Sequence, residues 1–289
     1  VAGGGGKGMR IARNDVSLAQ GFMTASSEAE RAFGNSAVYV EKLVERARHI
    51  EVQLLADNHG HVYQLGERDC SIQRRHQKLL EETPSPALTP DRRKKLLKAA
   101  VKAAQACKLR NVATIEFLWN EDAQEFYFME MNTRIQVEHP ITEEVTGADL
   151  VQLQIRAAAG EVMKFPDNEF EPRGHAIEVR VNAENPYKNF TPSPGPVQAV
   201  HFPGGPGIRI DSHVYSGYVI PPFYDSMIGK IIARGKNREE ALTRMARALA
   251  EFKMAGPATT VPVAQALLAD ARFLRGEYNT HFLEQFMND

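Results

Sequence analysis

Apolar and polar residues alternate along several stretches of the chain, and a period of two predicts β-strands. The clearest alternating apolar positions are Ile50, Val52 and Leu54 and, later, Ile177, Val179 and Val181. The second stretch predicts a half-buried strand whose exposed side carries Glu178, Arg180 and Asn182. Further strands are predicted at 38–40, 62–65, 112–119 and 125–132, with turns at 57–60 and 121–124.

Helices are predicted where apolar residues recur every three or four positions behind a capping signal. The predicted helices run from the Thr-Pro pair at 89–90 through 104, from 149 to 159, from Asn237 through 252, and from a Ser27–Glu30 capping box to Phe33. Strands and helices follow one another without strict alternation, so the predicted fold class is α+β with antiparallel sheet prominent. Residues 166–174, polar and bounded by Pro and Gly, predict a linker.

Composition indicates a soluble globular protein, with 43% hydrophobic and 25% charged residues in 289 positions. This length suits one large domain or two ordinary ones. No apolar run approaches the ~20 residues that span a bilayer. With 35 Lys and Arg against 36 Asp and Glu, the net charge of −1 argues against a general nucleic-acid-binding protein.

The two cysteines, Cys70 and Cys107, form no CxxC pair, so neither a disulfide scaffold nor a structural zinc site is predicted. A reducing compartment is the default expectation. Residues 1–8 have no apolar core and no cleavage-site pattern, so they do not form a signal peptide. The chain lacks an initiator Met and begins inside a glycine run, which favours a fragment of a longer protein.

Three oxygen-bearing side chains suggest a magnesium site. Glu130 and Asn132 lie two apart on a predicted strand and so point to one face, and Glu116 lies on the preceding strand. Two carboxylates and an amide oxygen suit Mg²⁺ with nucleotide phosphates. Solvated polar positions on an open sheet face explain the same residues equally well.

Two N-terminal segments are compatible with nucleotide binding. The glycines at 3–8 form no Walker motif, but glycine lets backbone N–H groups approach phosphate and Lys7 adds a charge; a flexible linker is the alternative. Glu41 and Lys42 are suited to contact adenine, or they simply end an exposed strand.

Two charged segments are compatible with anion binding. Residues 74–78 (Arg-Arg-His-Gln-Lys) suit a solvated face, a nucleic-acid contact, or a site for bicarbonate or phosphate. Arg134 and Glu138 bracket Gln136 in a loop closed by Pro140, which places a cation near a candidate general base. The alternative for this Arg and Glu is a surface ion pair.

Taken together, these segments resemble biotin carboxylase, alone or as the first part of acyl-CoA and pyruvate carboxylases. The matching segments are residues 3–8, 48–51, 67–78, 130–140 and 224–228, and the resemblance covers essentially the whole chain. It implies a partial ATP-grasp fold at 1–162, with a glycine-rich lid at 1–44 and the metal, ATP and bicarbonate site at 45–162. The family's C-terminal domain is then expected at 173–289.

The resemblance also implies a role for each candidate residue. The implied ligands of Mg²⁺ (or Mn²⁺) are Glu116, Glu130 and Asn132. The implied ATP-binding residues are Gly4, Gly5, Gly6, Lys7, Glu41, Lys42, His49, Gln73, His76 and Glu116. The implied bicarbonate and biotin site comprises Lys78, Arg134, Gln136, Val137, Glu138 and Arg180. Within it Glu138 is the base, and Arg180 stabilises the biotin enolate.

The implied activity is that of a ligase, in which bicarbonate and ATP form carboxyphosphate and biotin on a carrier protein is carboxylated. The implied partners are a biotin carboxyl carrier, a carboxyltransferase and a second copy of the chain, in the cytoplasm or, in a eukaryote, the mitochondrial matrix. The final acceptor stays open among acetyl-CoA (as in fatty acid biosynthesis), another acyl-CoA and pyruvate. The family's N-terminal domain and a phosphate-contacting lysine are expected before Val1, so low activity is expected of this chain alone.

Two rival functions remain at this point. Another ATP-grasp ligase, activating a carboxylate for attack by an amine, explains the metal residues but not the segments at 74–78 and 134–138. An inactive dimerisation or scaffold fragment is the rival from a different class. Bicarbonate-dependent ATP turnover separates all three functions.

Overall fold

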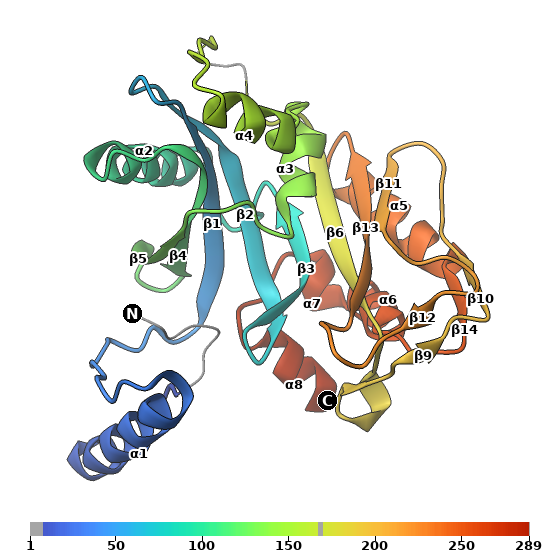
Figure 1. Ribbon diagram of the computed structural model, residues 1–289, viewed down its shortest axis with the longest axis horizontal. Helices are drawn as coiled ribbons and strands as arrows, with labels where there is room; N and C mark the ends of the chain where they lie inside the picture. The colour runs from blue at the N-terminus through green and yellow to red at the C-terminus, as the bar shows by residue number, and fades with distance from the viewer. Residues whose placement is uncertain (1–7, 167–169, 289) are drawn as a thin grey trace.

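The computed structural model describes residues 8–166 and 170–288, and an eight-stranded antiparallel sheet dominates it (Figure 1). The strand order is β11-β13-β6-β3-β2-β1-β4-β5. These strands are β1 (Ala47–Ala56), β2 (Val62–Arg74), β3 (Gln77–Thr83), β4 (Asn111–Asn120), β5 (Glu125–Asn132), β6 (His175–Asn182), β11 (Ile208–Ser212) and β13 (Met227–Gly235). The predicted α+β class with prominent antiparallel sheet is therefore confirmed.

One half of the sheet buries an apolar face under α2 (Pro90–Ala106). Ile50, Val52 and Leu54 of β1 have no exposed surface and join α2 in one cluster, as their alternation predicts. α2 begins where the sequence indicates, because the Thr89 side chain accepts from the backbone N–H of Arg92 at its first turn. This packing fixes which side of β1 faces the core.

The other half of the sheet packs against C-terminal helices. These are α5 (Arg238–Glu251), α6 (Val261–Ala269), α7 (Ala271–Leu274) and α8 (Phe282–Asn288). Ile177, Val179 and Val181 of β6 join this second core. Asn237 caps α5 through the backbone N–H of Glu240, as predicted.

Two helices lie over part of the opposite face. α3 (His139–Thr146) packs Ile141 and Val145 against Ile232 of β13, and α4 (Leu150–Ala158) packs beside Leu55 of β1. The polar residues of the site described below lie on this same face of the sheet, where Glu138 directly precedes α3. α4 follows the predicted 149–159 helix closely, with Asp149 as its cap.

Small elements complete the C-terminal region. They are β7 (Glu184–Asn185), a 3₁₀ turn (Pro186–Lys188), β8 (Thr191–Pro192), β9 (Gly195–Pro196), β10 (Ala199–His201), β12 (Val219–Ile220) and β14 (Lys253–Ala255). β7 pairs with β8, β9 with β12, and β10 with β14.

The N-terminal segment differs from the prediction in two ways. The predicted start at Ser27 is wrong, because α1 (Asp15–Phe33) begins twelve positions earlier at a capping box between Asn14 and Ser17. The predicted strand at 38–40 is also wrong: Tyr39 is 82% exposed, and these residues form no strand. Within the described residues α1 buries only Ala25, and it lies to one side of the sheet (Figure 1).

The prediction for β6 was half right. Its apolar side is buried as expected, but Glu178 has no exposed surface and Arg180 is mostly buried, so the polar side does not face solvent. The reason is that β6 pairs with β3 and β13 and α3 covers it, which makes it an interior strand. The division into units at 1–162 and 173–289 stays a prediction, and the sheet runs unbroken across it through the β3–β6 pairing.

Within residues 8–166 and 170–288, no helix has the length and apolar character needed to cross a membrane.

Candidate active site

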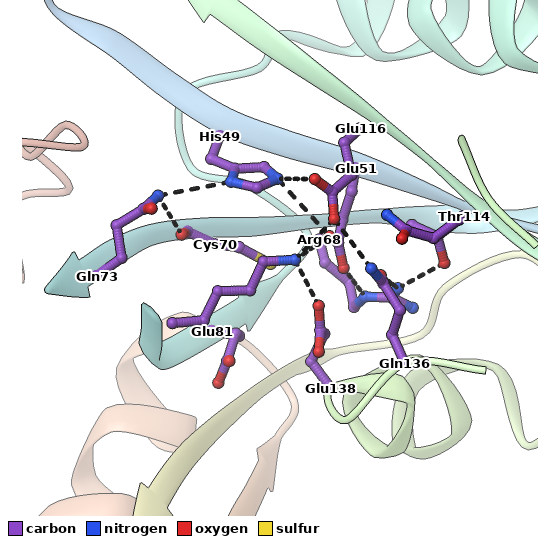
Figure 2. Close-up of polar contacts among 12 residues, drawn as sticks. His49, Glu51, Arg68, Cys70, Gln73, Glu81, Thr114, Glu116, Gln136 and Glu138 are labelled. Carbon is purple, nitrogen blue, oxygen red and sulfur yellow. Dashed lines mark hydrogen bonds and ion pairs between the residues drawn. The ribbon is translucent and has the colours of Figure 1, made fainter. Parts of the chain in front are cut away.

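A polar face on β1 and β4 forms the floor of the site. His49, Glu51 and Gln53 alternate with the buried apolar residues of β1, so all three point away from α2. Glu116 of β4 lies directly opposite Glu51. Figure 2 shows His49, Glu51 and Glu116 turned toward one another. Paired strands thus bring acids and a histidine together in a buried place.

Lys78 at the start of β3 connects three of the carboxylates. Its Nζ lies 2.6 Å from Glu51, 3.1 Å from Glu116 and 2.6 Å from Glu138. Within residues 8–166 and 170–288, two sets of residues have ligand atoms close enough to hold a metal: His49, Glu51 and Glu116, and Glu51, Cys70 and Glu138. In this structure the Lys78 ammonium is the cation that contacts carboxylates of both sets.

A bulge brings Lys78 into this cluster. Lys78 and Glu81 are three residues apart and would lie on opposite faces of a regular strand. Ile72 pairs with Leu80, whereas Gln73 pairs with Lys78, so β3 has one extra residue here. Such a bulge re-aims the side chain beside it.

Two cationic side chains donate hydrogen bonds to Glu138, which lies just before α3. Its Oε1 accepts from Lys78 and its Oε2 from Nη2 of Arg180, 2.8 Å away. Arg180 in turn donates through Nε to Oε1 of Glu81, at 2.6 Å. A carboxylate between two cations, one on β3 and one on β6, is the centre of the site.

Arg68 of β2 holds the floor rigid. It has no exposed surface, and its Nε donates to Oε1 of Glu51 at 2.6 Å. Its other nitrogens donate to Gln53, Thr114, Gln136 and Thr142. Although burial lowers it, the attraction of Glu51 raises the pKa of Arg68, so this guanidinium is a permanent positive charge.

The charges in the cluster stabilise one another. Burial raises the pKa of Glu51, but Lys78 and Arg68 outweigh this and lower it to about 2. Burial also opposes charge on Glu116, yet His49 and Lys78 hold its pKa well below the ordinary range. Burial lowers the pKa of Lys78, while the surrounding acids, led by Glu51, raise it well above its usual value. Lys78 is therefore a fixed cation.

The loop before α3 closes the site on one side. Gln136 is buried, donates to Glu116 at 2.9 Å and accepts from Arg68 (Figure 2). The carbonyl of Val137 accepts from Nζ of Lys230 on β13 at 2.7 Å. These contacts hold Glu138 in place over the floor.

Several predicted site residues lie together and others do not. The structure brings together His49, Gln73, Lys78, Glu116, Gln136, Val137, Glu138 and Arg180, with Gln73 reaching Nδ1 of His49 at 3.5 Å. Arg134 is exposed and contacts Asn132 at 3.5 Å rather than Glu138. His76 is exposed in the turn between β2 and β3, with a left-handed backbone.

The predicted metal ligands lie on neighbouring strands. Glu130 of β5 lies directly opposite Glu116 of β4, so both start from the same face of the sheet. The Asn132 amide donates to Oε1 of Glu130 at 3.2 Å. Glu116 is buried and engaged by Lys78, whereas Glu130 is exposed at the sheet edge. A set of hard oxygen donors at a solvent-open edge fits Mg²⁺, which retains several waters when bound.

The predicted adenine and lid residues lie away from this cluster. Glu41 and Lys42 are exposed, and Nζ of Lys42 lies 5.3 Å from the Tyr127 ring centroid. Gly4, Gly5, Gly6 and Lys7 lie outside the described residues.

Sequence reasoning assigned no role to several members of the cluster: Glu51, Arg68, Cys70, Glu81, Glu178 and Lys230. The alternation of His49, Glu51 and Gln53 with apolar residues was a sequence signal that could have placed Glu51 on the polar face of its strand. The others sit in strands with few exposed residues, where a buried charge is visible only once its partners are known.

Family comparisons divide the chain into two matched parts. The model of the carbamoyl-phosphate synthase L chain, ATP-binding domain, matches residues 1–165, and the biotin carboxylase C-terminal domain matches residues 178–285. The chain belongs to the biotin carboxylase family. The predicted ATP-grasp fold with a biotin carboxylase C-terminal domain is thereby confirmed.

Individual members of this family are closely similar. Biotin carboxylase 1 of Bacillus subtilis is 54% identical over 99% of this chain, which spans 64% of the length of that relative. The biotin carboxylase domain dimer of Hydrogenobacter thermophilus 2-oxoglutarate carboxylase, crystallised with MgADP, ADP and bicarbonate, superposes with a TM-score of 0.95 at 44% identity, covering 100% of this chain and 64% of that one. Rhizobium etli pyruvate carboxylase superposes with a TM-score of 0.93 at 42% identity, covering 98% of this chain and 26% of that one.

Proposed function

We propose that this chain is the catalytic part of an ATP- and bicarbonate-dependent biotin carboxylase, a ligase that forms carboxybiotin. The observation that carries the proposal is Glu138, held between Lys78 and Arg180 at 2.6 and 2.8 Å. A carboxylate flanked by two fixed cations suits a small anion that must lose a proton and then react. The related domain crystallised with MgADP and bicarbonate supports the substrate pair.

In the proposed reaction, Lys78, Arg134, Gln136 and the backbone of Val137 bind bicarbonate, and Glu138 takes its proton. The bicarbonate oxygen then attacks the γ-phosphorus of ATP, giving carboxyphosphate and ADP. Arg134 is exposed near Asn132 in this structure, so its part requires the side chain to turn toward the anion. The buried cations supply the positive charge that phosphoryl transfer needs.

ATP would be bound from the β4–β5 side of the site. Glu116, Glu130 and Asn132 would hold Mg²⁺ or Mn²⁺, which would neutralise phosphate charge when bound. His49, Gln73 and His76, with Glu41 and Lys42, would line the nucleotide site, and the lid residues Gly4, Gly5, Gly6 and Lys7 would close over it. Closure would keep water from carboxyphosphate.

Arg180 would act at the biotin step. Carboxyphosphate breaks down to carbon dioxide and phosphate, and the phosphate removes the ureido proton of biotin. The planar guanidinium of Arg180 would hold the enolate oxygen until carbon dioxide is captured. For this to happen, Nη2 of Arg180 must leave Glu138.

The proposal includes partners and a location. The substrate biotin would be attached to a separate carrier protein or domain, carboxybiotin would pass to a carboxyltransferase, and two copies of the chain would pair, as in the related domain dimer. We propose the cytoplasm, or the mitochondrial matrix in a eukaryote. The similar structures belong to carboxylases named for different acceptors, 2-oxoglutarate and pyruvate, so the proposal ends at carboxybiotin.

The test is ATP cleavage by the complete protein with and without bicarbonate, together with carboxylation of free biotin. We expect phosphate release only when bicarbonate is present, and carboxybiotin only when biotin is added. The match at residues 1–165 to a carbamoyl-phosphate synthase domain keeps an amine-using ligase as the second candidate. Phosphate release that required ammonia or another amine would favour that ligase and reject the proposal, and no ATP cleavage at all would favour a scaffold.

A further inference from the structure

Among the described residues, one acid of the buried cluster lacks a hydrogen-bond partner. Glu178, in the middle of β6, has no exposed surface, and among the described residues neither of its carboxylate oxygens has a hydrogen-bond partner. An ionised carboxylate in such a place costs several kcal/mol. The reaction proposed above makes no use of this residue.

A second acid lies directly across from it. Glu81 of β3 pairs with Glu178 in the sheet register, so their side chains share a face with Cβ atoms about 5 Å apart. Glu81 is also fully buried. Its Oε1 accepts from Nε of Arg180, but its Oε2 has no partner within the described part of the chain.

The surroundings do not neutralise a second negative charge. On the apolar side, Ile232 of β13 lies opposite Glu178, and α3 adds Ile141 and Val145 beside it. Of the nearby cations, Arg180 is bonded to Glu81 and Glu138, and Lys230 to the Val137 carbonyl and Asp211. Lys78, which also attracts Glu81, is bonded to three other carboxylates. Glu138 adds a further like charge.

Two carboxyl groups so placed do not both ionise at neutral pH. Burial, then the neighbouring Glu81, raises the pKa of Glu178 well above its ordinary value. Burial raises the pKa of Glu81 to about 7, even though Arg180 opposes this. Glu178 therefore carries a proton, and its O–H is a donor, while Oε2 of Glu81, on the residue paired with it across the sheet, is an acceptor that lacks a donor among the described residues.

We infer that Glu178 and Glu81 form a proton-sharing carboxyl pair that positions Arg180 for the biotin step. The inference rests on the proposed function, because that function gives Arg180 its role. In this pair the O–H of Glu178 donates to Glu81, and the single negative charge of the pair, on Glu81, holds Nε of Arg180 in place. The Nη groups are then free to leave Glu138 for the enolate oxygen. If both carboxyl groups were ionised, the added negative charge would attract Arg180 more strongly, keep it from moving, and repel the enolate.

The experiment follows two activities of the complete protein across pH: carboxylation of free biotin and bicarbonate-dependent ATP cleavage. We expect Glu178→Leu to lower the ratio of carboxylation to cleavage by about tenfold to a hundredfold, as misplacement of a reacting group does. Glu178→Gln should restore most of this ratio, because a neutral amide donates as the neutral acid does. The ratio should fall at alkaline pH in the parent protein but not in Glu178→Gln.

Glu67→Gln is the matched control. Glu67 is also fully buried on a strand, and one of its oxygens has no partner in the part of the chain that the structure describes, but it contacts Arg93 and Ser85 instead of Arg180. Its substitution should leave the ratio of the two activities unchanged at every pH. Equal ratios for Glu178→Leu, Glu178→Gln and the parent would overturn the inference.

Infrared spectroscopy gives a readout that does not depend on activity or on the Leu variant folding. The parent protein at neutral pH should show the carbonyl band of a neutral carboxylic acid, and Glu178→Gln should lose the component of this band that Glu178 contributes. An unchanged spectrum would overturn the inference even in a fully active enzyme. Conversely, if the band is lost but the parent cleaves no ATP with bicarbonate, the proposed function fails while the carboxyl pair stands.

Discussion

At the scale of single residues, Glu138 and Arg180 share one hydrogen bond, and the proposed function assigns them to different steps. Glu138 also accepts a hydrogen bond from Lys78, which contacts Glu51 and Glu116 as well. The Arg180 side chain is bonded to Glu138 and Glu81. Without Arg180, Glu138 keeps its contact with Lys78, and without Glu138, Arg180 keeps its contact with Glu81. The two substitutions should therefore have different kinetic consequences.

Glu138→Gln in the complete protein should lower bicarbonate-dependent ATP cleavage and biotin carboxylation together, by ~10²–10⁴-fold, the usual effect of losing a general base. The amide keeps the shape and some hydrogen bonding, so folding should be retained. Parallel assays of phosphate release and carboxybiotin formation measure this. Loss of carboxylation alone would contradict the role of Glu138 as the base for bicarbonate.

Arg180→Gln should depress biotin carboxylation more than bicarbonate-dependent ATP cleavage, because the proposed function gives the guanidinium its main part at the biotin step, while Lys78 still holds Glu138 for the bicarbonate step. The same paired assays apply. Arg275→Gln is the control, since Arg275 is exposed and forms a surface ion pair with Glu277. Equal losses of both activities in a folded Arg180→Gln protein would remove Arg180 from the biotin step.

At the scale of elements, β3 joins the two halves of the molecule. It pairs with β2 on one side and with β6 on the other. Glu82 reinforces this junction from within β3, because it accepts from His175 of β6 at 2.6 Å and from Arg238 of α5 and Tyr278. A single buried carboxylate thereby connects three parts of the C-terminal region to the central strand.

Glu82→Gln should lower the free energy of unfolding by about 3–5 kcal/mol, the usual cost of breaking a buried ion pair from one side. Arg238 would be left without its carboxylate, and Gln cannot accept from all of these donors. Denaturant unfolding measures the change. Glu251→Gln, which removes only an exposed pair with Arg247, should cost below about 1 kcal/mol.

The same residue predicts a pH dependence of stability. Burial opposes ionisation, but hydrogen bonds from His175 and Arg238 lower the pKa of Glu82 from 4.5 to about 2. Because this value is depressed on folding, its contribution is complete above pH 4.5 and is lost as pH falls toward 2. The contribution is about 3 kcal/mol, at about 1.4 kcal/mol per pKa unit. The difference in unfolding free energy between the parent and Glu82→Gln should shrink over this pH range; a constant difference would contradict it.

At the scale of the whole molecule, the sheet is continuous across the predicted domain boundary. Leu80 of β3 lies opposite Val179 of β6, and both belong to one buried cluster. The polar cluster of the candidate site also crosses this boundary, because Arg180 comes from one predicted unit and Glu138 from the other. Neither unit presents a complete site without the other.

We therefore expect residues 45–288 to unfold in one cooperative transition. Ile177 is a residue of β6 buried in the C-terminal core. Ile177→Ala should shift the single transition to lower temperature and lower the free energy of unfolding by about 2–5 kcal/mol. Calorimetry tests this, since a single transition has equal calorimetric and van't Hoff enthalpies. Two separate transitions, with only one of them sensitive to Ile177→Ala, would show that the units fold independently.

The sequence alone determined the class of fold, most of the sheet and the family. Alternation and capping located β1, β4, β5, α2 and α5, because these signals act over a few neighbouring residues. The segments at 67–78 and 130–140 carried the family resemblance for the same local reason. The candidate residues could be named from those segments without any structure.

Only the tertiary structure decided which polar residues are buried and which of them meet. Strand pairing between distant segments, and a bulge in β3, bring Lys78 and Arg180 onto one carboxylate of Glu138. The supposedly exposed side of β6 became an interior face because β3, β13 and α3 cover it. Glu178 is the clearest case: it is buried with no hydrogen-bond partner among the described residues, and this depends on everything packed around it and leaves no mark in the local sequence.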